Sequence, residues 1–204
     1  MISAKFLLTS LVVVLVPGTG VIYTVSTGLA QRWRASIVAA VGCTLGILPH
    51  LTASILGLSA ILHMSARAFQ VIKFAGSIYL LYLAWSMWRE TGALKLDASA
   101  QKTNAPQIVL KGILINILNP KLTMFFFAFL PLFLSPDAAS PTRQLIGLSA
   151  VFMGMTLVIF VLYGIFASGI SGYLLNSPKV LRRLQRSFAV IFAALAVHLA
   201  LSER

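Results

Sequence analysis

Residues 111–133 read Lys-Gly-Ile-Leu-Ile-Asn-Ile-Leu-Asn-Pro-Lys-Leu-Thr-Met-Phe-Phe-Phe-Ala-Phe-Leu-Pro-Leu-Phe. The stretch is apolar and long enough to cross a bilayer, which takes about 20 such residues. Its middle nevertheless contains two amides, a proline and a lysine, at Asn116, Asn119, Pro120 and Lys121. Proline has no N–H, so the carbonyl of Asn116, four residues earlier, loses its helical partner. Irregular backbone at membrane depth survives only where protein or a water-filled cavity satisfies it. We therefore predict a broken helix that lines a polar site.

The composition of the whole chain indicates a membrane protein. Of its 204 residues, 59% are hydrophobic and 10% are charged, and the mean hydropathy is +0.94. Soluble domains carry about 25% charged residues. The net charge of +12 comes from basic residues between apolar segments. Basic residues in that position set the orientation of the spans and contact anionic lipid. We therefore expect membrane lipid as a partner, and no nucleic acid.

The few cysteines and histidines exclude several kinds of site. Cys43 is the only cysteine, which excludes a disulfide framework and a paired-thiol redox centre. Three scattered histidines and one cysteine do not supply the ligands of a usual zinc site, and no H-E-x-x-H motif is present. We expect no metal, no cofactor and no enzymatic activity.

Six apolar segments predict an all-α integral membrane protein with six transmembrane helices. The segments cover residues 6–27, 35–62, 71–88, 111–133, 145–170 and 187–202. They form two sets of three, and proline breaks the first helix of each set, at Pro17-Gly18 and at Asn119-Pro120. Three spans per repeat is an odd number, so the second repeat must be inverted. Within one transmembrane domain, 1–204, we place the repeats at about 5–88 and 108–204, and a loop at about 89–107.

Inverted repeats with matching broken helices are typical of secondary transporters, which bind their substrate near the midplane. The alternative is a pair of harmless proline kinks, which are common in membrane helices.

Basic residues predict the orientation. One set of loops contains ten of them: Arg32, Arg34, Arg89, Lys95, Lys102, Lys111, Lys179, Arg182, Arg183 and Arg186. The other side contains five: Lys5, Arg67, Lys73, Arg143 and Arg204. The positive-inside rule places the first set, including the loop at about 89–107, in the cytoplasm and both termini outside.

Polar groups of both kinds surround the two breaks. Half-helices that begin after a proline present free N–H groups and a positive dipole end, which suit an anion. The carbonyls that the prolines release, those of Val13 and Asn116, suit a cation. A free amino acid carries both charges, although many polar solutes would also fit. The predicted substrate-binding residues are Pro17, Gly18, Thr19, Tyr23, Asn116, Asn119, Pro120 and Lys121.

Two ionisable residues within the predicted spans are candidates for function. Lys121 lies ten residues after Lys111, about 15 Å along a helix. An ionisable residue near mid-bilayer is a functional candidate by default, although Lys121 can also hydrogen-bond the carbonyls at the break. His50 is the leading proton-coupling residue, because the spans contain no carboxylate. A hydrogen-bonded packing role suits His50 equally well.

These motifs resemble the LysE/RhtB family of amino-acid exporters. The resemblance rests on Pro17-Gly18 with the glycines that follow, on residues 73–83, and on residues 112–133, and it covers most of residues 10–135. Thr19 and Gly20 replace the family's proline and the Asn or Asp beside it, and Ala84 stands where the family often has glycine. The resemblance implies a multi-pass exporter of amino acids or related metabolites in the bacterial inner membrane, coupled to the proton gradient.

Two alternatives stay open at this point. One is an exporter of another small polar metabolite, and the other is a membrane structural subunit without transport activity. The sequence does not decide the oligomeric state, and a homo-oligomer is compatible with all three functions.

Overall fold

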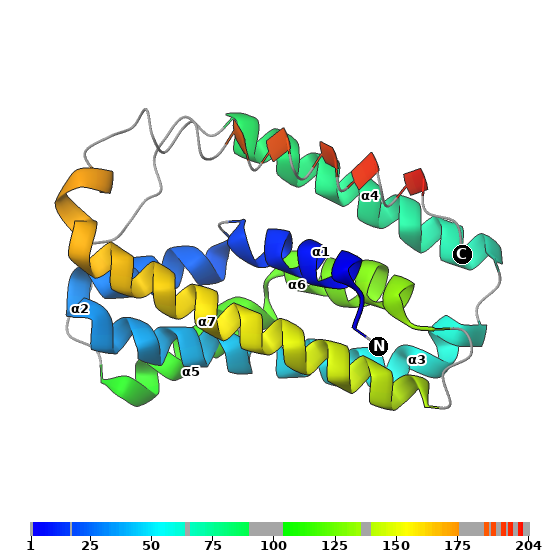
Figure 1. Cartoon of the computed structure of the whole chain (residues 1–204), viewed down its shortest axis with the longest axis horizontal. Coiled ribbons are helices and arrows are strands. Elements are labelled where there is room, and N and C mark those ends of the chain that lie inside the picture. The colour runs from blue at the N-terminus through cyan, green and yellow to red at the C-terminus, as the bar shows by residue number, and fades with distance from the viewer. Residues whose placement is uncertain are drawn as a thin grey trace.

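The computed structural model describes residues 2–16, 18–63, 66–89, 104–135 and 140–175, together with ten residues between 186 and 201. All regular structure in these residues is helical and none of them is in a strand, which confirms the all-α class. Figure 1 shows long helices lying alongside one another.

Nine helical elements have bounds within the described residues up to 175, and the described residues between 186 and 201 are helical as well. The nine elements are α1 (Ala4–Leu15), α2 (Thr19–Leu45), α3 (Leu48–His63), α4 (Ala66–Arg89), α5 (Ala105–Ile117), α6 (Pro120–Met124), the π-helical turn η1 (Phe125–Phe129), the 3-10 turn η2 (Leu130–Phe133) and α7 (Pro141–Leu175).

The first predicted segment is broken where expected. Helix α1 ends at Leu15 and α2 begins at Thr19, with Val16 and Gly18 in extended conformations between them. Pro17 itself lies outside the described residues. Further along, α2 kinks at Arg32, whose φ of 70° is rare for a residue with a side chain. The kink lies where the sequence separates the first apolar segment from the second.

The fourth predicted segment is broken as well. Helix α5 ends at Ile117, α6 begins at Pro120, and the chain bends by 52° between them. Asn119 caps α6 by accepting the backbone N–H of Lys121 at 3.1 Å, in the way that Asn favours at helix starts. The predicted break at Asn119-Pro120 is therefore confirmed.

Within the described residues, length and composition identify two membrane spans, or three if a bent pair of helices is one span. Residues Thr19–Gly57 and Pro141–Ala167 are each long and apolar enough to cross a membrane. The bent pair of Ala105–Ile117 and Pro120–Phe133 makes a third span if it is counted as one. The six-span count and the inverted repeats stay predictions, as do the repeat boundaries. Most of the loop at about 89–107 lies outside the described residues.

Glycines bring α2 close to α5. A Cβ on Gly42 would lie 2.6 Å from the carbonyl oxygen of Val109, and one on Gly46 would lie 2.7 Å from that of Ile113. Such small-xxx-small patterns allow the backbones of two membrane helices to touch. The contact fixes α5, and therefore the break at its end, against α2.

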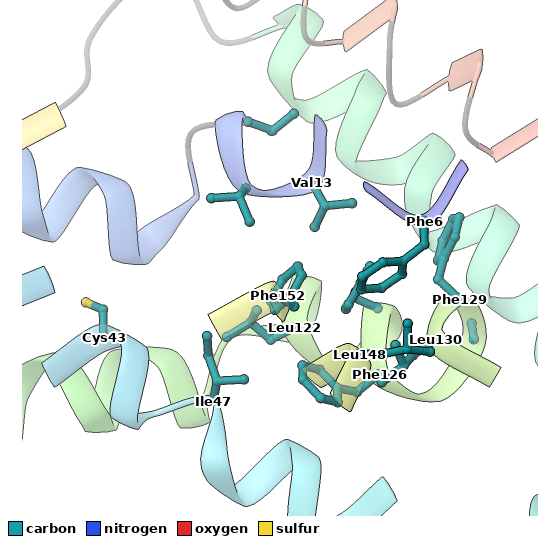
Figure 2. Packing of buried hydrophobic residues seen from close by; sticks show 14 of the residues in the cluster. Phe6, Val13, Cys43, Ile47, Leu122, Phe126, Phe129, Leu130, Leu148 and Phe152 are labelled. Atoms are coloured by element: carbon teal, nitrogen blue, oxygen red, sulfur yellow. The ribbon is translucent and has the colours of Figure 1, made fainter. Parts of the chain in front are cut away.

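An aromatic cluster packs α1, the end of the fourth segment and α7 together (Figure 2). Phe125 and Phe152 stack with their ring centroids 4.1 Å apart, and Phe126 meets Phe152 edge-on at 5.8 Å. Phe6 approaches from α1 and is fully buried. These contacts seat the half-helix that follows Pro120 between α1 and α7.

Helix α4 runs beside the described residues of the C-terminal segment (Figure 1). The guanidinium of Arg186 lies 5.3 Å from the ring centroid of Trp88 at the end of α4. Phe74, Ile78 and Trp85 on α4 are exposed, and Ile78 and Trp85 line a pocket that Ala189 and Val190 share.

Candidate functional site

A small cavity lies where the two broken helices meet. Its volume is about 10 Å³, close to the space that one water molecule needs. The lining residues come from both sides of both breaks and from α7: Val13, Val14, Gly20, Val21, Asn116, Asn119, Lys121, Leu122, Phe152, Thr156 and Phe160. In this conformation the cavity is too small for an amino acid.

Lys121 joins the two breaks directly. Its Nζ donates to the carbonyl of Val13 at 3.0 Å and to that of Val16 at 2.9 Å. Both carbonyls belong to the C-terminal end of α1, where the helix dipole is negative and cations are stabilised. A third carbonyl there, that of Leu15, accepts from the hydroxyl of Tyr163 at 2.7 Å. The depth of this contact in the membrane remains a prediction.

The two asparagines of the second break form a network. Nδ2 of Asn116 donates to the carbonyl of Cys43 at 2.7 Å, and Nδ2 of Asn119 donates to Oδ1 of Asn116 at 3.4 Å. Asn116 is 1% exposed, and buried amides of this kind are normally hydrogen-bonded. The network orients both amide side chains at the wall of the cavity.

His50 binds the carbonyl that Pro120 releases. Its Nε2 lies 3.0 Å from the carbonyl oxygen of Asn116. A carbonyl can only accept, so Nε2 carries the hydrogen and donates it. The ring is buried, and its centroid lies 6.1 Å from that of Phe126, with 28° between the two ring planes. His50 does not line the cavity, but it contacts a residue that does.

The start of α2 forms another wall of the cavity. Gly18 is the N-cap and supplies no side-chain cap to the first turn, so the amide groups there keep the anion preference of a helix N-terminus. A Cβ on Gly20 would lie 2.6 Å from Oδ1 of Asn116. The glycine therefore allows the two breaks to approach each other.

Some of the eight predicted substrate-binding residues line or adjoin the cavity, and others do not. Asn116, Asn119 and Lys121 line the cavity, and Gly18 and Pro120 adjoin it along the chain. Thr19 is exposed, and the hydroxyl of Tyr23 donates to the carbonyl of Ile108 at 2.9 Å. Neither of these two lines the cavity. Pro17 is outside the described residues, and contact of any of the eight with substrate stays a prediction.

Three residues on α7 that line the cavity were not predicted from the sequence. Phe152, Thr156 and Phe160 are four residues apart and share one helical face. The hydroxyl of Thr156 donates to the carbonyl of Phe152 at 2.8 Å. The polar Thr156 on an otherwise apolar face was the available signal, but nothing local shows which helix that face meets.

The described residues contain no group of three or more His, Cys, Asp or Glu side chains that could hold a metal ion. Of the residues that line the cavity, only Lys121 is ionisable.

Comparison with known proteins identifies the family. The family model for LysE type translocators matches residues 11–203. The chain belongs to the LysE family. It is a family of efflux transporters and not of enzymes.

Three relatives extend over nearly the whole chain. A homoserine/homoserine lactone efflux protein of Salmonella typhimurium is 30% identical and covers 96% of this chain and 94% of its own length. A threonine efflux protein of Escherichia coli is 27% identical, with 94% of each chain covered. A leucine efflux protein of Klebsiella pneumoniae is 25% identical and covers 96% of this chain and 92% of its own. No solved structure matches the chain.

Proposed function

We propose that this LysE-family protein is a secondary active exporter of amino acids or closely related small zwitterionic metabolites across the bacterial inner membrane. The observation that carries the proposal is the cavity between two broken helices, with polar groups of both signs around it. The relatives named above export homoserine and homoserine lactone, threonine, or leucine. The three amino acids carry an α-ammonium and an α-carboxylate group, and the lactone carries the ammonium and an ester carbonyl.

The charges around the cavity match those of a zwitterion. Lys121 and the uncapped start of α2 attract a carboxylate. The carbonyls at the end of α1 attract an ammonium group. Val13, Gly20 and Lys121, which belong to these two sets of groups, all line one small cavity.

An inverted-repeat architecture explains how this site would open to each side in turn. The first segments of the two sets meet through Lys121 and Val13, and the third segments meet through Trp88 and Arg186. Pairing between corresponding segments is what a two-fold axis in the membrane plane produces. A cavity that holds about one water fits an occluded state, from which one repeat rocks against the other.

Proton coupling is assigned to His50. The ring is buried, donates to the carbonyl of Asn116, and so adjoins the cavity wall. Histidine is the usual proton-transfer side chain. Because Nε2 already carries a hydrogen, a second proton would bind Nδ1, and the charged ring would donate more strongly to the carbonyl of Asn116.

The test is transport by everted membrane vesicles from cells with and without the protein. We expect an imposed proton gradient to drive accumulation of one or more radiolabelled amino acids, homoserine, threonine and leucine among them. Accumulation of other polar metabolites only would favour the alternative substrate class. Absence of transport for every solute in a broad screen, with the protein present and folded, would favour a structural subunit.

A further inference from the structure

The carbonyls of Val13 and Val16 converge on one nitrogen atom, the Nζ of Lys121. Two carbonyl oxygens at a helix C-terminus, within 3.0 Å of one nitrogen, form a site for an ammonium group. Lys121 is 9% exposed, so this ammonium site is shielded from solvent. The protein therefore fills its own cation site with a side chain.

We propose that Lys121 occupies, in the empty transporter, the subsite that receives the substrate's ammonium group, and that only a ligand that also offers Lys121 a carboxylate or carbonyl acceptor can draw Lys121 out of it. The inference rests on the proposed function, because it assumes that a zwitterion binds between the breaks. Lys121 then has a second role beside attraction of the carboxylate, because its side chain excludes simple amines from the ammonium subsite.

Competition for two carbonyls is the physical reason. The ammonium of a ligand and that of Lys121 cannot both bind the oxygens of Val13 and Val16, and two cations placed close together repel each other. A ligand with an amine alone must therefore displace Lys121 without offering it a new partner. A ligand that also carries a carboxylate replaces both lost hydrogen bonds with a charge-assisted contact.

The displacement that this exchange requires is short. A Cβ on Gly18 would lie 3.1 Å from Nζ of Lys121 and 3.8 Å from Nδ2 of Asn119. The ammonium group thus already borders the start of α2, where the uncapped first turn favours an anion. A carboxylate bound there would meet Lys121 after rotation of the lysine side chain alone. Departure of the ammonium from the end of α1 would also enlarge the cavity.

The experiment compares three ligands that differ only in their charged groups. L-Homoserine carries both groups, 3-aminopropan-1-ol lacks the carboxylate, and 4-hydroxybutyrate lacks the amine. Binding to the purified full-length protein is measured by calorimetry for wild type, Lys121→Gln and Lys121→Arg. The matched control is Lys111→Gln, which makes the same change at an exposed lysine of the same broken segment.

We expect wild type and Lys111→Gln to bind homoserine and to bind 3-aminopropan-1-ol at least about tenfold more weakly. In Lys121→Gln the affinity for homoserine should fall and that for 3-aminopropan-1-ol should rise, by about tenfold each. Lys121→Arg should keep the preference for the zwitterion, because it keeps the cation. If Lys121→Gln does not fold, Lys121→Arg and wild type together provide the test.

Two results would overturn the inference while leaving the proposed function in place. One is a wild-type protein that binds homoserine and 3-aminopropan-1-ol equally well. The other is a folded Lys121→Gln variant that loses homoserine binding and gains no affinity for the amine. If the transport screen identifies a different amino acid, that amino acid and its own amine and acid replace the three ligands. Failure to export any amino acid would instead contradict the proposed function.

Discussion

Lys121 and His50 act as side-chain partners for backbone groups that helices normally satisfy by themselves. Each binds the carbonyl that lies four residues before a proline, Val13 for Lys121 and Asn116 for His50. At a break inside a bilayer such partners replace the lost backbone bond, because lipid offers none. The carbonyl of Asn116 also accepts the backbone N–H of Asn119 at 3.1 Å. The same two residues are the candidates for function that the sequence predicts, so the observed structural contacts and the proposed functional roles involve the same side chains.

The role of His50 can be separated from its hydrogen bond. We expect both His50→Ala and His50→Gln to lose most gradient-driven export while keeping substrate-for-substrate exchange. Exchange needs the site, but net export needs a group that gains and loses a proton in each cycle. The Gln variant is the matched control, because its amide can donate to Asn116 but does not titrate. Gradient-driven export that survives in His50→Gln and fails only in His50→Ala would assign His50 to packing.

The sequence predicts only part of the cavity lining. Two amides and a lysine within an apolar stretch are costly unless they have partners, and Asn116, Asn119 and Lys121 do line the cavity. Tyr23 is also among the predicted binding residues, but its hydroxyl donates to the carbonyl of Ile108 on α5 and it does not line the cavity. Spacing along a helix gives the face of a residue. It does not give the neighbour that the face meets, which depends on the packing of distant segments.

At the scale of elements, the closeness of α2 and α5 controls where the second break lies. Gly42 and Gly46 of α2 touch the backbone of α5, and α5 leads directly to Asn119 and Pro120. Small residues four apart are typical of close contacts between membrane helices. The 52° bend after α5 followed from Pro120. The sequence did not predict which helix each glycine would contact, because that depends on how distant segments pack.

A methyl group at this contact should separate the helices. We expect Gly42→Ala to lower the free energy of unfolding by about 1–3 kcal/mol, because its Cβ would lie 2.6 Å from the carbonyl of Val109, which is backbone and cannot rotate away. Gly147→Ala is the matched control, since no atom lies within 4 Å of its Cβ position. Thermal unfolding in detergent measures both. Equal stability of the two variants would show that the helices are not in close contact.

At the scale of the whole molecule, hydropathy identifies a membrane protein, and the number of its spans stays a prediction. Among the described residues, two segments qualify as spans by length and composition, and a bent pair makes a third. Broken helices and kinks such as that at Arg32 make the bounds of a span differ from the bounds of an apolar run. The repeat symmetry depends on the relative placement of all segments and stays a prediction.

The orientation is tested by labelling a single cysteine. In a Cys43→Ala background we place a cysteine at residue 99 by Ser99→Cys, within the loop at about 89–107. The excess of basic residues on that side predicts a cytoplasmic loop. An impermeant maleimide should label the cysteine in everted vesicles and not in intact cells. The reverse pattern would show that the protein is inserted the other way round.

The central claim is that a small zwitterion binds between the two broken helices, and protection of a cysteine in the cavity by substrate tests it most directly. The two sites are Thr156→Cys, at the cavity, and Thr44→Cys, away from it, each in the Cys43→Ala background. Both threonines are buried and donate to a carbonyl four residues earlier at 2.8 Å, so the substitutions are closely matched.

The measurement is the rate of modification by a small methanethiosulfonate with and without saturating amino acid. We expect the amino acid to slow modification at residue 156 by at least about tenfold and to leave the rate at residue 44 unchanged. Binding of the same amino acid with no protection at residue 156, or with equal protection at both residues, would contradict the claim.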